Sequence, residues 1–144
     1  AMKIEINNRA NYKIDLHLVN RVAAEFARAY KVPAKELSIA FVRDAEIKKI
    51  NQTYRGLNRP TDVLSFAGEG DDFGEVIIDY QQIKRQADEL GHGARRELVF
   101  ILVHGLLHLL GYGDETEKGR RKMIKLGEEF IKKYPPSKGG VGEV

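Results

Sequence analysis

The sequence predicts a single α+β domain in which a mixed four-stranded sheet packs with about five helices. Its 144 residues are 42% hydrophobic and 31% charged, which is typical of one globular domain with a sizeable core. Four short segments show the polar and apolar alternation or the short apolar runs of strands. Longer segments with apolar residues every three or four positions, as in amphipathic helices, lie between and after them. This order predicts one mixed layer structure.

The first half of the chain alternates predicted strands and helices. Residues 3–7 alternate polar and apolar side chains as a half-buried strand does, and residues 37–42 follow the same rule. Between them, the apolar spacing predicts an amphipathic helix over 13–30. A short helix is expected next, with Asp44 as its N-cap, and the segment 56–60 breaks it.

A predicted hairpin occupies the middle of the chain. Residues 62–66 and 75–79 have the composition of strands, and the segment 68–74 between them is rich in glycine and acidic residues, as turns are. We therefore expect these two strands to pair through that turn.

Three predicted helices complete the domain. The first spans 79–90 and is closed by Gly91, and the second, the most apolar, spans about 94–110 and is closed by Gly111. The last spans about 114–134.

The domain is expected to span 1–134 and to be followed by a disordered tail, 135–144, which holds too little apolar surface to offset its ordering entropy. The absence of cysteine excludes a disulfide framework, a thiolate metal cage and a cysteine nucleophile, and favours a reducing cytoplasm. The longest apolar run, 98–110, is too short to span a membrane. The net charge of +3 is compatible with a nucleic-acid partner but does not require one.

The most apolar predicted helix carries two of the four histidines. His104 and His108 are four residues apart, so their imidazoles project from one helical face and can coordinate a single metal ion. The structural alternative is a pair of hydrogen-bonded core histidines, whose burial costs on the order of a few kcal/mol unless both find partners. The spacing favours the metal site.

The residues after His108 extend this pattern. From His104 to Asp114 the chain reads H-x-x-x-H-x-x-G-x-x-D, a spacing similar to that of metzincin metalloproteases. In that arrangement the glycine, here Gly111, ends the helix and lets the residue three positions later supply a third ligand. Two imidazoles, the Asp114 carboxylate and a water make an open zinc site of the catalytic type.

Asp114 also has a structural interpretation. Residues 114–117, Asp-Glu-Thr-Glu, form a capping-box pattern with Asp114 as the N-cap of the last helix, so local sequence leaves both roles open. Proteases of the H-E-x-x-H kind carry a glutamate as general base directly after the first histidine, whereas Gly105 stands there. Peptide hydrolysis by that mechanism is therefore disfavoured.

Two motifs occur in a characteristic order. Residues 59–66 read Arg-Pro-Thr-Asp-Val-Leu-Ser-Phe, and residues 104–112 read His-Gly-Leu-Leu-His-Leu-Leu-Gly-Tyr. Together they resemble the YbeY family of bacterial metal-dependent endoribonucleases, and the resemblance extends from Ile47 to Met123. It implies a zinc-binding α+β fold, a cytoplasmic location, and cleavage of single-stranded RNA in small-subunit rRNA 3′-end maturation and ribosome quality control. The implied partners are single-stranded RNA, rRNA, and the small ribosomal subunit with its associated factors, without a membrane.

The resemblance also implies the site residues. His104 and His108 correspond to metal ligands at the catalytic centre. The family pattern continues Gly-Tyr-Asp-His, but residues 111–114 read Gly-Tyr-Gly-Asp, so Asp114 stands where the family has its third histidine. The expected metal set is therefore His104, His108 and Asp114, with an anionic carboxylate in place of a neutral imidazole.

Arg55 is the remaining catalytic candidate. It ends the segment 51–55, which matches the family stretch upstream of the Pro-Thr-Asp motif, where an arginine is functionally important. A guanidinium facing the metal holds a scissile phosphate in a bidentate manner and offsets the charge that develops on it. Thr61 and Asp62 are expected to cap a turn rather than to act in the site.

The resulting hypothesis is a zinc-dependent, single-strand-specific endoribonuclease. One alternative is a noncatalytic ribosome- or RNA-binding protein with a structural metal, which the altered third ligand favours. The other is a zincin-type metalloprotease, which the histidine spacing favours and Gly105 opposes.

Overall fold

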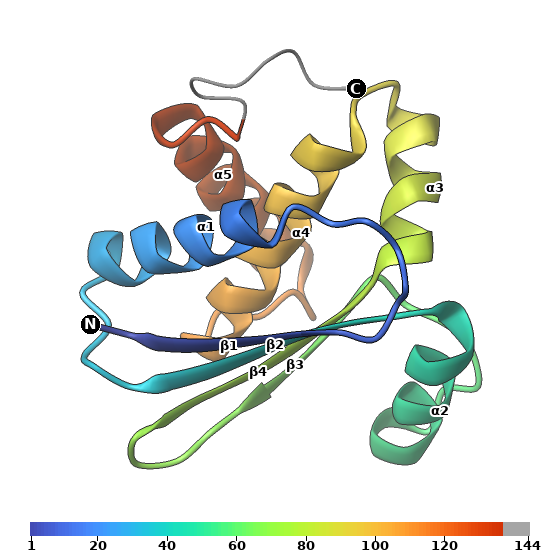
Figure 1. Ribbon diagram of the computed structural model, residues 1–144, viewed down its shortest axis with the longest axis horizontal. Helices are drawn as coiled ribbons and strands as arrows, with labels where there is room; N and C mark the ends of the chain where they lie inside the picture. Colours follow the sequence, from blue (N-terminus) through green and yellow to red (C-terminus); the bar gives the residue numbers. More distant parts are fainter. Residues whose placement is uncertain (137–144) are drawn as a thin grey trace.

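The computed structural model describes residues 1–136, and residues 137–144 lie outside the described part (Figure 1). Within the described part, one sheet contains four strands, β1 (Lys3–Asn8), β2 (Glu36–Val42), β3 (Val63–Ala67) and β4 (Asp72–Asp79). The five helices are α1 (Leu16–Ala29), α2 (Asp44–Arg55), α3 (Tyr80–Leu90), α4 (Ala94–Leu109) and α5 (Glu117–Lys133). The predicted α+β fold is confirmed.

The sheet is mixed, with the strand order β1-β2-β4-β3. β1 pairs with β2 and β2 with β4 in parallel, whereas β3 runs antiparallel to β4, so the predicted hairpin of these two strands is confirmed. β3 therefore lies at an edge of the sheet, and its outer side is left for other parts of the molecule or for a ligand.

Helix α4 lies at the centre of the larger helical layer. It packs against α1, α3 and α5 and lies over β3 and β4 on one face of the sheet, while α2 lies on the opposite side (Figure 1). The second, smaller core beneath α2 consists of Ala40, Val42, Ile47, Leu64 and Ile77. No helix among residues 1–136 has the length and apolarity needed to cross a bilayer.

Gly105 brings α4 close to the sheet. A Cβ atom built at this position would lie 2.8 Å from Val76 Cγ1 and 3.1 Å from Val63 Cγ2. The Ser65 hydroxyl donates a hydrogen bond of 2.8 Å to the Gly105 carbonyl oxygen. Position 105 thus faces the sheet, and the space there does not accommodate the glutamate of an H-E-x-x-H protease.

Helix starts differ from the sequence prediction at three places. Helix α1 begins at Leu16 rather than at residue 13, because Asp15 Oδ1 accepts a hydrogen bond from the Leu18 amide. Asp44 is not an N-cap: Arg43 holds that position, and the Asp44 carboxylate instead pairs with Arg85 at 2.7 Å.

The third difference concerns Asp114. Helix α5 begins at Glu117 and is capped by Thr116, whose Oγ1 accepts a hydrogen bond of 3.0 Å from the Gly119 amide. Of the two roles that the sequence left open for Asp114, the structure therefore does not support the helix cap, and the carboxylate is left for other partners.

The predicted tail begins at residue 135, and its residues 137–144 lie outside the described part. Pro136 is described, and its carbonyl oxygen accepts a hydrogen bond of 2.8 Å from Arg95 Nε. The end of the described chain is thus attached to the first turn of α4.

Candidate functional site

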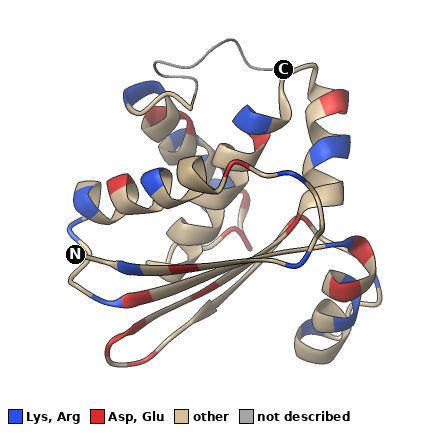
Figure 2. Ribbon diagram, viewed as in Figure 1, with Lys and Arg blue, Asp and Glu red and all other residues tan. Residues whose placement is uncertain are grey.

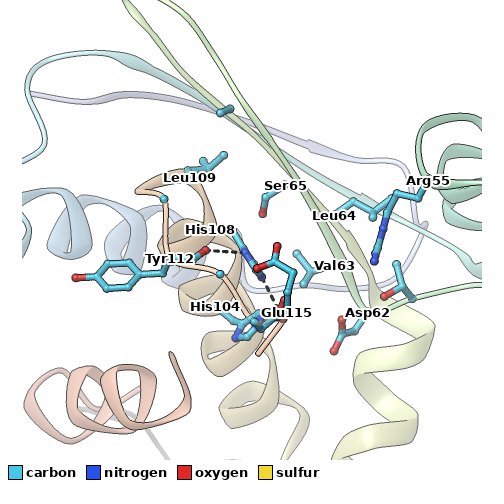
Figure 3. Close-up of a pocket in the computed structure, with 15 residues that line it drawn as sticks. Arg55, Asp62, Val63, Leu64, Ser65, His104, His108, Leu109, Tyr112 and Glu115 are labelled. Carbon is cyan, nitrogen blue, oxygen red and sulfur yellow. Dashed lines mark hydrogen bonds and ion pairs between the residues drawn. The ribbon is translucent and has the colours of Figure 1, made fainter. Parts of the chain in front are cut away.

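A cleft of about 650 Å³ borders the edge strand β3. Its floor is β3, one wall is the end of α4, and the other side is the segment that joins α4 to α5 (Figure 3). The four residues that the sequence singles out, Arg55, His104, His108 and Asp114, all line it. Positions up to 59 residues apart in the chain are thus brought to one cavity.

The two histidines project from adjacent turns of α4 into this cleft. Their ring centroids are 4.8 Å apart, and the ring planes are nearly perpendicular at 81°. The His104 side chain is 16% exposed and that of His108 is 27% exposed. Burial and the neighbouring His108 lower the pKa of His104, against the opposing effect of Asp114, so the neutral, metal-binding form of His104 is favoured.

Asp114 reaches both histidines from the segment after α4. Its Oδ2 atom lies 3.3 Å from His104 Nε2 and 3.4 Å from His108 Nε2. His104, His108 and Asp114 each offer one potential ligand atom, and these three atoms lie within 4.8 Å of one another. In a tetrahedral zinc site with bonds of about 2.0–2.1 Å, two ligand atoms lie about 3.3–3.4 Å apart. The Asp114 separations therefore suit a shared ion.

The other nitrogen of His108 is already occupied. Nδ1 lies 3.1 Å from the carbonyl oxygen of Tyr112. Because a carbonyl oxygen only accepts, Nδ1 carries the proton, and the Nε2 lone pair of neutral His108 is directed toward Asp114. Metal-binding histidines are commonly oriented in this way by a backbone carbonyl. The donor set, two imidazoles and one carboxylate, thus fits a divalent transition metal.

Arg55 enters the cleft from the other end of β3. It is the last residue of α2, and its guanidinium points into the cavity (Figure 3). Gly56, with a φ of 70°, ends the helix directly after it. Within residues 1–136, no acidic group pairs with Arg55. Its charge is therefore available to a bound anion.

Ser65 and Asp62 also line the cleft. The hydroxyl of Ser65 donates to Gly105, so it stabilises the contact of α4 with β3. The amides of Asp62 and Val63 favour the ionised form of the Asp62 carboxylate, against the effect of burial. It also faces the cavity (Figure 3), and burial raises its pKa.

A partly buried polar network next to Asp62 was missed by the sequence interpretation. Gln86 interacts with Asp62 and donates a hydrogen bond of 2.9 Å to Glu97 Oε2. The other oxygen of Glu97 lies 2.8 Å from His92 Nε2, and Glu97 is only 3% exposed. The one sequence signal for it was an acidic residue on the otherwise apolar helix 94–110.

Comparison with known proteins shows the family. The model of the family described as "Endoribonuclease YbeY" matches residues 2–135. A relative from Moorella thermoacetica, curated as Endoribonuclease YbeY, is 43% identical over 90% of this chain and 96% of its own. A relative of the same name from Syntrophomonas wolfei is 37% identical over 92% of this chain and 96% of its own.

A solved structure shows the same architecture. The solution structure of TM1509 from Thermotoga maritima superposes with a TM-score of 0.61 and 25% identity, covering 95% of both chains. The family match spans α4, β3 and the segment that carries Asp114, so the cleft belongs to the shared domain. The chain is therefore a member of the endoribonuclease YbeY family of enzymes.

Proposed function

We propose that this protein is a zinc-dependent endoribonuclease that cleaves single-stranded RNA at the cleft between β3 and α4. His104, His108 and Asp114 would hold the ion. The observation that carries the proposal is the position of Asp114 Oδ2, at 3.3 and 3.4 Å from the two histidine Nε2 atoms, at the mouth of a cleft that also contains Arg55. The endoribonuclease names of the relatives support RNA as the substrate.

Zn²⁺ bound to these three residues would act as a Lewis acid on a phosphate oxygen or a water. Arg55 binds the scissile phosphate through its guanidinium and offsets the charge that develops on the nonbridging oxygens. Asp62 lies in the same cleft, and burial raises the pKa of its carboxyl group, so it is the nearby group that could accept a proton from the attacking oxygen or donate one to the departing oxygen. The Tyr112 carbonyl holds the His108 ring in its orientation.

The biological substrate that we propose is the 3′ region of the small-subunit rRNA in the cytoplasm, with the small ribosomal subunit and its associated factors as partners. The family resemblance supports this assignment. The metalloprotease alternative has no support from the structure, because a Cβ atom at position 105 would lie only 2.8 Å from Val76 Cγ1, which leaves no room for the glutamate of that mechanism.

The direct test is cleavage of a 5′-labelled unstructured oligoribonucleotide by the purified protein with and without added zinc, beside the DNA oligonucleotide of the same sequence and an RNA duplex. We expect zinc-dependent cleavage of the single-stranded RNA alone, and its loss in His104→Ala and Asp114→Ala. Zinc content by elemental analysis of the same samples separates lost metal from lost chemistry. RNA binding that persists in His104→Ala, with no cleavage by the wild type, would instead support the noncatalytic alternative.

A further inference from the structure

The structure leaves one aromatic ring exposed beside the cleft. Tyr54 is 69% exposed, whereas every other phenylalanine and tyrosine in the described range 1–136 is buried or partly buried. Its position continues the apolar spacing of Ile47 and Ile50 on α2, yet the smaller core under α2 ends before it reaches Tyr54. An exposed apolar ring needs no explanation by itself. Its surroundings make it informative.

The ring is held in place from one side. The centroid of the Phe66 ring lies 5.1 Å from that of Tyr54, with an angle of 64° between the planes, which is an edge-to-face contact. Phe66 packs in turn against the smaller core. Tyr54 is therefore supported by packing while most of its surface stays accessible, which lowers the entropy lost when a flat ligand binds to it.

Two neighbouring residues place the Tyr54 ring next to the cleft. Along α2, the following residue is Arg55, which lines the cleft. Along β3, Phe66 stands between Ser65 and Ala67, which both line the cleft. Since side chains alternate across a strand, Phe66 and Tyr54 lie on the opposite face of this edge strand. A linear ligand that crosses the outer side of β3 would therefore extend from the cleft, past Arg55, to Tyr54.

The charge of α2 and the following loop suits a polyanion. The acidic residues of the first turn of α2 are compensated, since Asp44 pairs with Arg85 and Glu46 with Arg9. Four cations of α2 and the following loop have no anionic partner within residues 1–136: Lys48, Lys49, Arg55 and Arg59. Figure 2 shows that acidic residues mark the beginning of α2 and that basic residues follow.

We propose that Tyr54 is a base-stacking site for the single-stranded RNA whose scissile phosphate is bound by Arg55. This inference rests on the proposed function and specifies how the cleft would select its substrate. An unpaired base offers its face to an aromatic ring, whereas a base inside a duplex is stacked between its neighbours. A cation without an anionic partner directly after a stacking ring, as Arg55 is after Tyr54, is a combination that single-strand binding proteins use.

The first test uses cleavage kinetics. Removal of a base-stacking ring weakens binding by roughly 5- to 150-fold. We expect Tyr54→Ala to raise KM for a single-stranded oligoribonucleotide within that range while kcat changes little, and Tyr54→Phe to behave like the wild type. Leu90→Ala is the matched control, because Leu90 is 63% exposed and lies at the end of α3 outside the cleft lining. An unchanged KM in an active Tyr54→Ala protein would overturn the proposal.

The second test measures RNA binding before cleavage takes place. Because the chain contains no tryptophan, Tyr54→Trp introduces a single tryptophan, which can be excited apart from the tyrosines, and Leu90→Trp provides its control. On stopped-flow mixing with single-stranded RNA, before cleavage proceeds, we expect quenching in Tyr54→Trp but not in Leu90→Trp, and little quenching by an RNA duplex. Equal signals from the two variants would refute stacking. A signal that depends on protein concentration without RNA would show instead that a second copy of the chain covers the ring.

The two tests together separate this inference from the proposed function. Zinc-dependent cleavage with no effect at Tyr54 leaves the function intact and removes the stacking site. RNA quenching of Tyr54→Trp without any cleavage keeps the stacking site and removes the nuclease. A protein that neither cleaves nor binds single-stranded RNA contradicts both.

Discussion

His108 Nδ1 donates its hydrogen bond to the carbonyl oxygen of Tyr112, four residues further along the chain. The segment that brings Asp114 to the histidines thus also orients the ring of one of them. Because the same short segment performs both tasks, the three potential ligands are positioned together when the chain after α4 turns at Gly111.

Zinc should stabilise the folded chain. An ion that binds only the native state contributes about 2.7 kcal/mol at a concentration 100 times its dissociation constant, which corresponds to a rise of several degrees in Tm for a chain of this size. Differential scanning fluorimetry of the metal-free protein with increasing zinc should show this rise. His104→Ala should show none of it, and an equal rise in that variant would argue against a site at His104.

Asp114 and Thr116 should have separable roles. Thr116→Ala removes the cap of α5 and should lower the free energy of unfolding by about 1 kcal/mol while zinc content stays unchanged. Asp114→Ala should show the reverse pattern, with zinc lost and the stability of the metal-free protein nearly unchanged. Urea denaturation and elemental analysis of both variants provide the comparison. Full zinc retention in Asp114→Ala would limit the site to the two histidines.

Arg55 should act on the chemical step. Loss of one charge-stabilising donor at a phosphate typically lowers kcat by about 10²–10³-fold. We expect a loss of this size for Arg55→Ala and a partial loss for Arg55→Lys, which keeps the charge but not the bidentate geometry. Zinc content and Tm should remain those of the wild type. Single-turnover cleavage of an oligoribonucleotide measures the effect, and an unchanged rate would remove Arg55 from the site.

Gly105→Ala should destabilise the protein despite the better helix propensity of alanine. The propensity gain is about 1 kcal/mol, whereas overpacking costs about 1–3 kcal/mol, and the nearest atom, Val76 Cγ1, would be only 2.8 Å from the new methyl group. We expect a net loss measurable by urea denaturation. The double variant with Val76→Ala should be less destabilised than the sum of the two single variants. Simple additivity would show that the helix shifts away instead.

Asp79 should make stability depend on pH. It is completely buried, and burial together with the neighbouring Asp44 raises its pKa to about 7. The folded state thus binds a proton that the unfolded chain, with an ordinary aspartate pKa near 3.9, has lost, so the stability from this group falls as pH rises from about 4 to 7. The slope for one group is at most about 1.4 kcal/mol per pH unit.

Asp79→Asn isolates this effect because asparagine keeps the cap of α3, whose first amides bond to Asp79 Oδ1. The difference in the free energy of unfolding between wild type and variant should change in favour of the variant from pH 4 to pH 7. A difference that does not vary with pH would show that Asp79 is ionised throughout this range.

The sequence was sufficient for the parts of the fold that depend on periodic burial. The strands, the hairpin of β3 and β4, and the apolar helix with His104 and His108 all follow from spacing. Helix starts were less predictable, because neighbouring residues such as Asp114 and Thr116 compete for one capping position with similar energies. Only the folded chain shows that Thr116 takes it.

The candidate site, like the fold, could be predicted from the sequence only in part. The helical spacing places the two histidines on one face, but the position of Arg55 in the same cleft depends on how α2 is set against β3. The polar network joins Asp62, which precedes β3, to Gln86 and Glu97 on the consecutive helices α3 and α4, and it leaves no periodic signal. The exposure of Tyr54 likewise depends on where the smaller core ends, although its spacing continues that of buried residues.

The location of Asp114 has a consequence for the whole C-terminal half of the molecule. This chain has no cysteine and therefore no covalent cross-link. An ion held between His104 and Asp114 would close a ring of the backbone that ties the end of α4 to the entry of α5. Such a closure restricts the unfolded ensemble in the way a disulfide does, but it can be made and undone by the zinc supply. When zinc is scarce, α5 would then be held less firmly to α4, and the cleft would also lose its proposed metal ion.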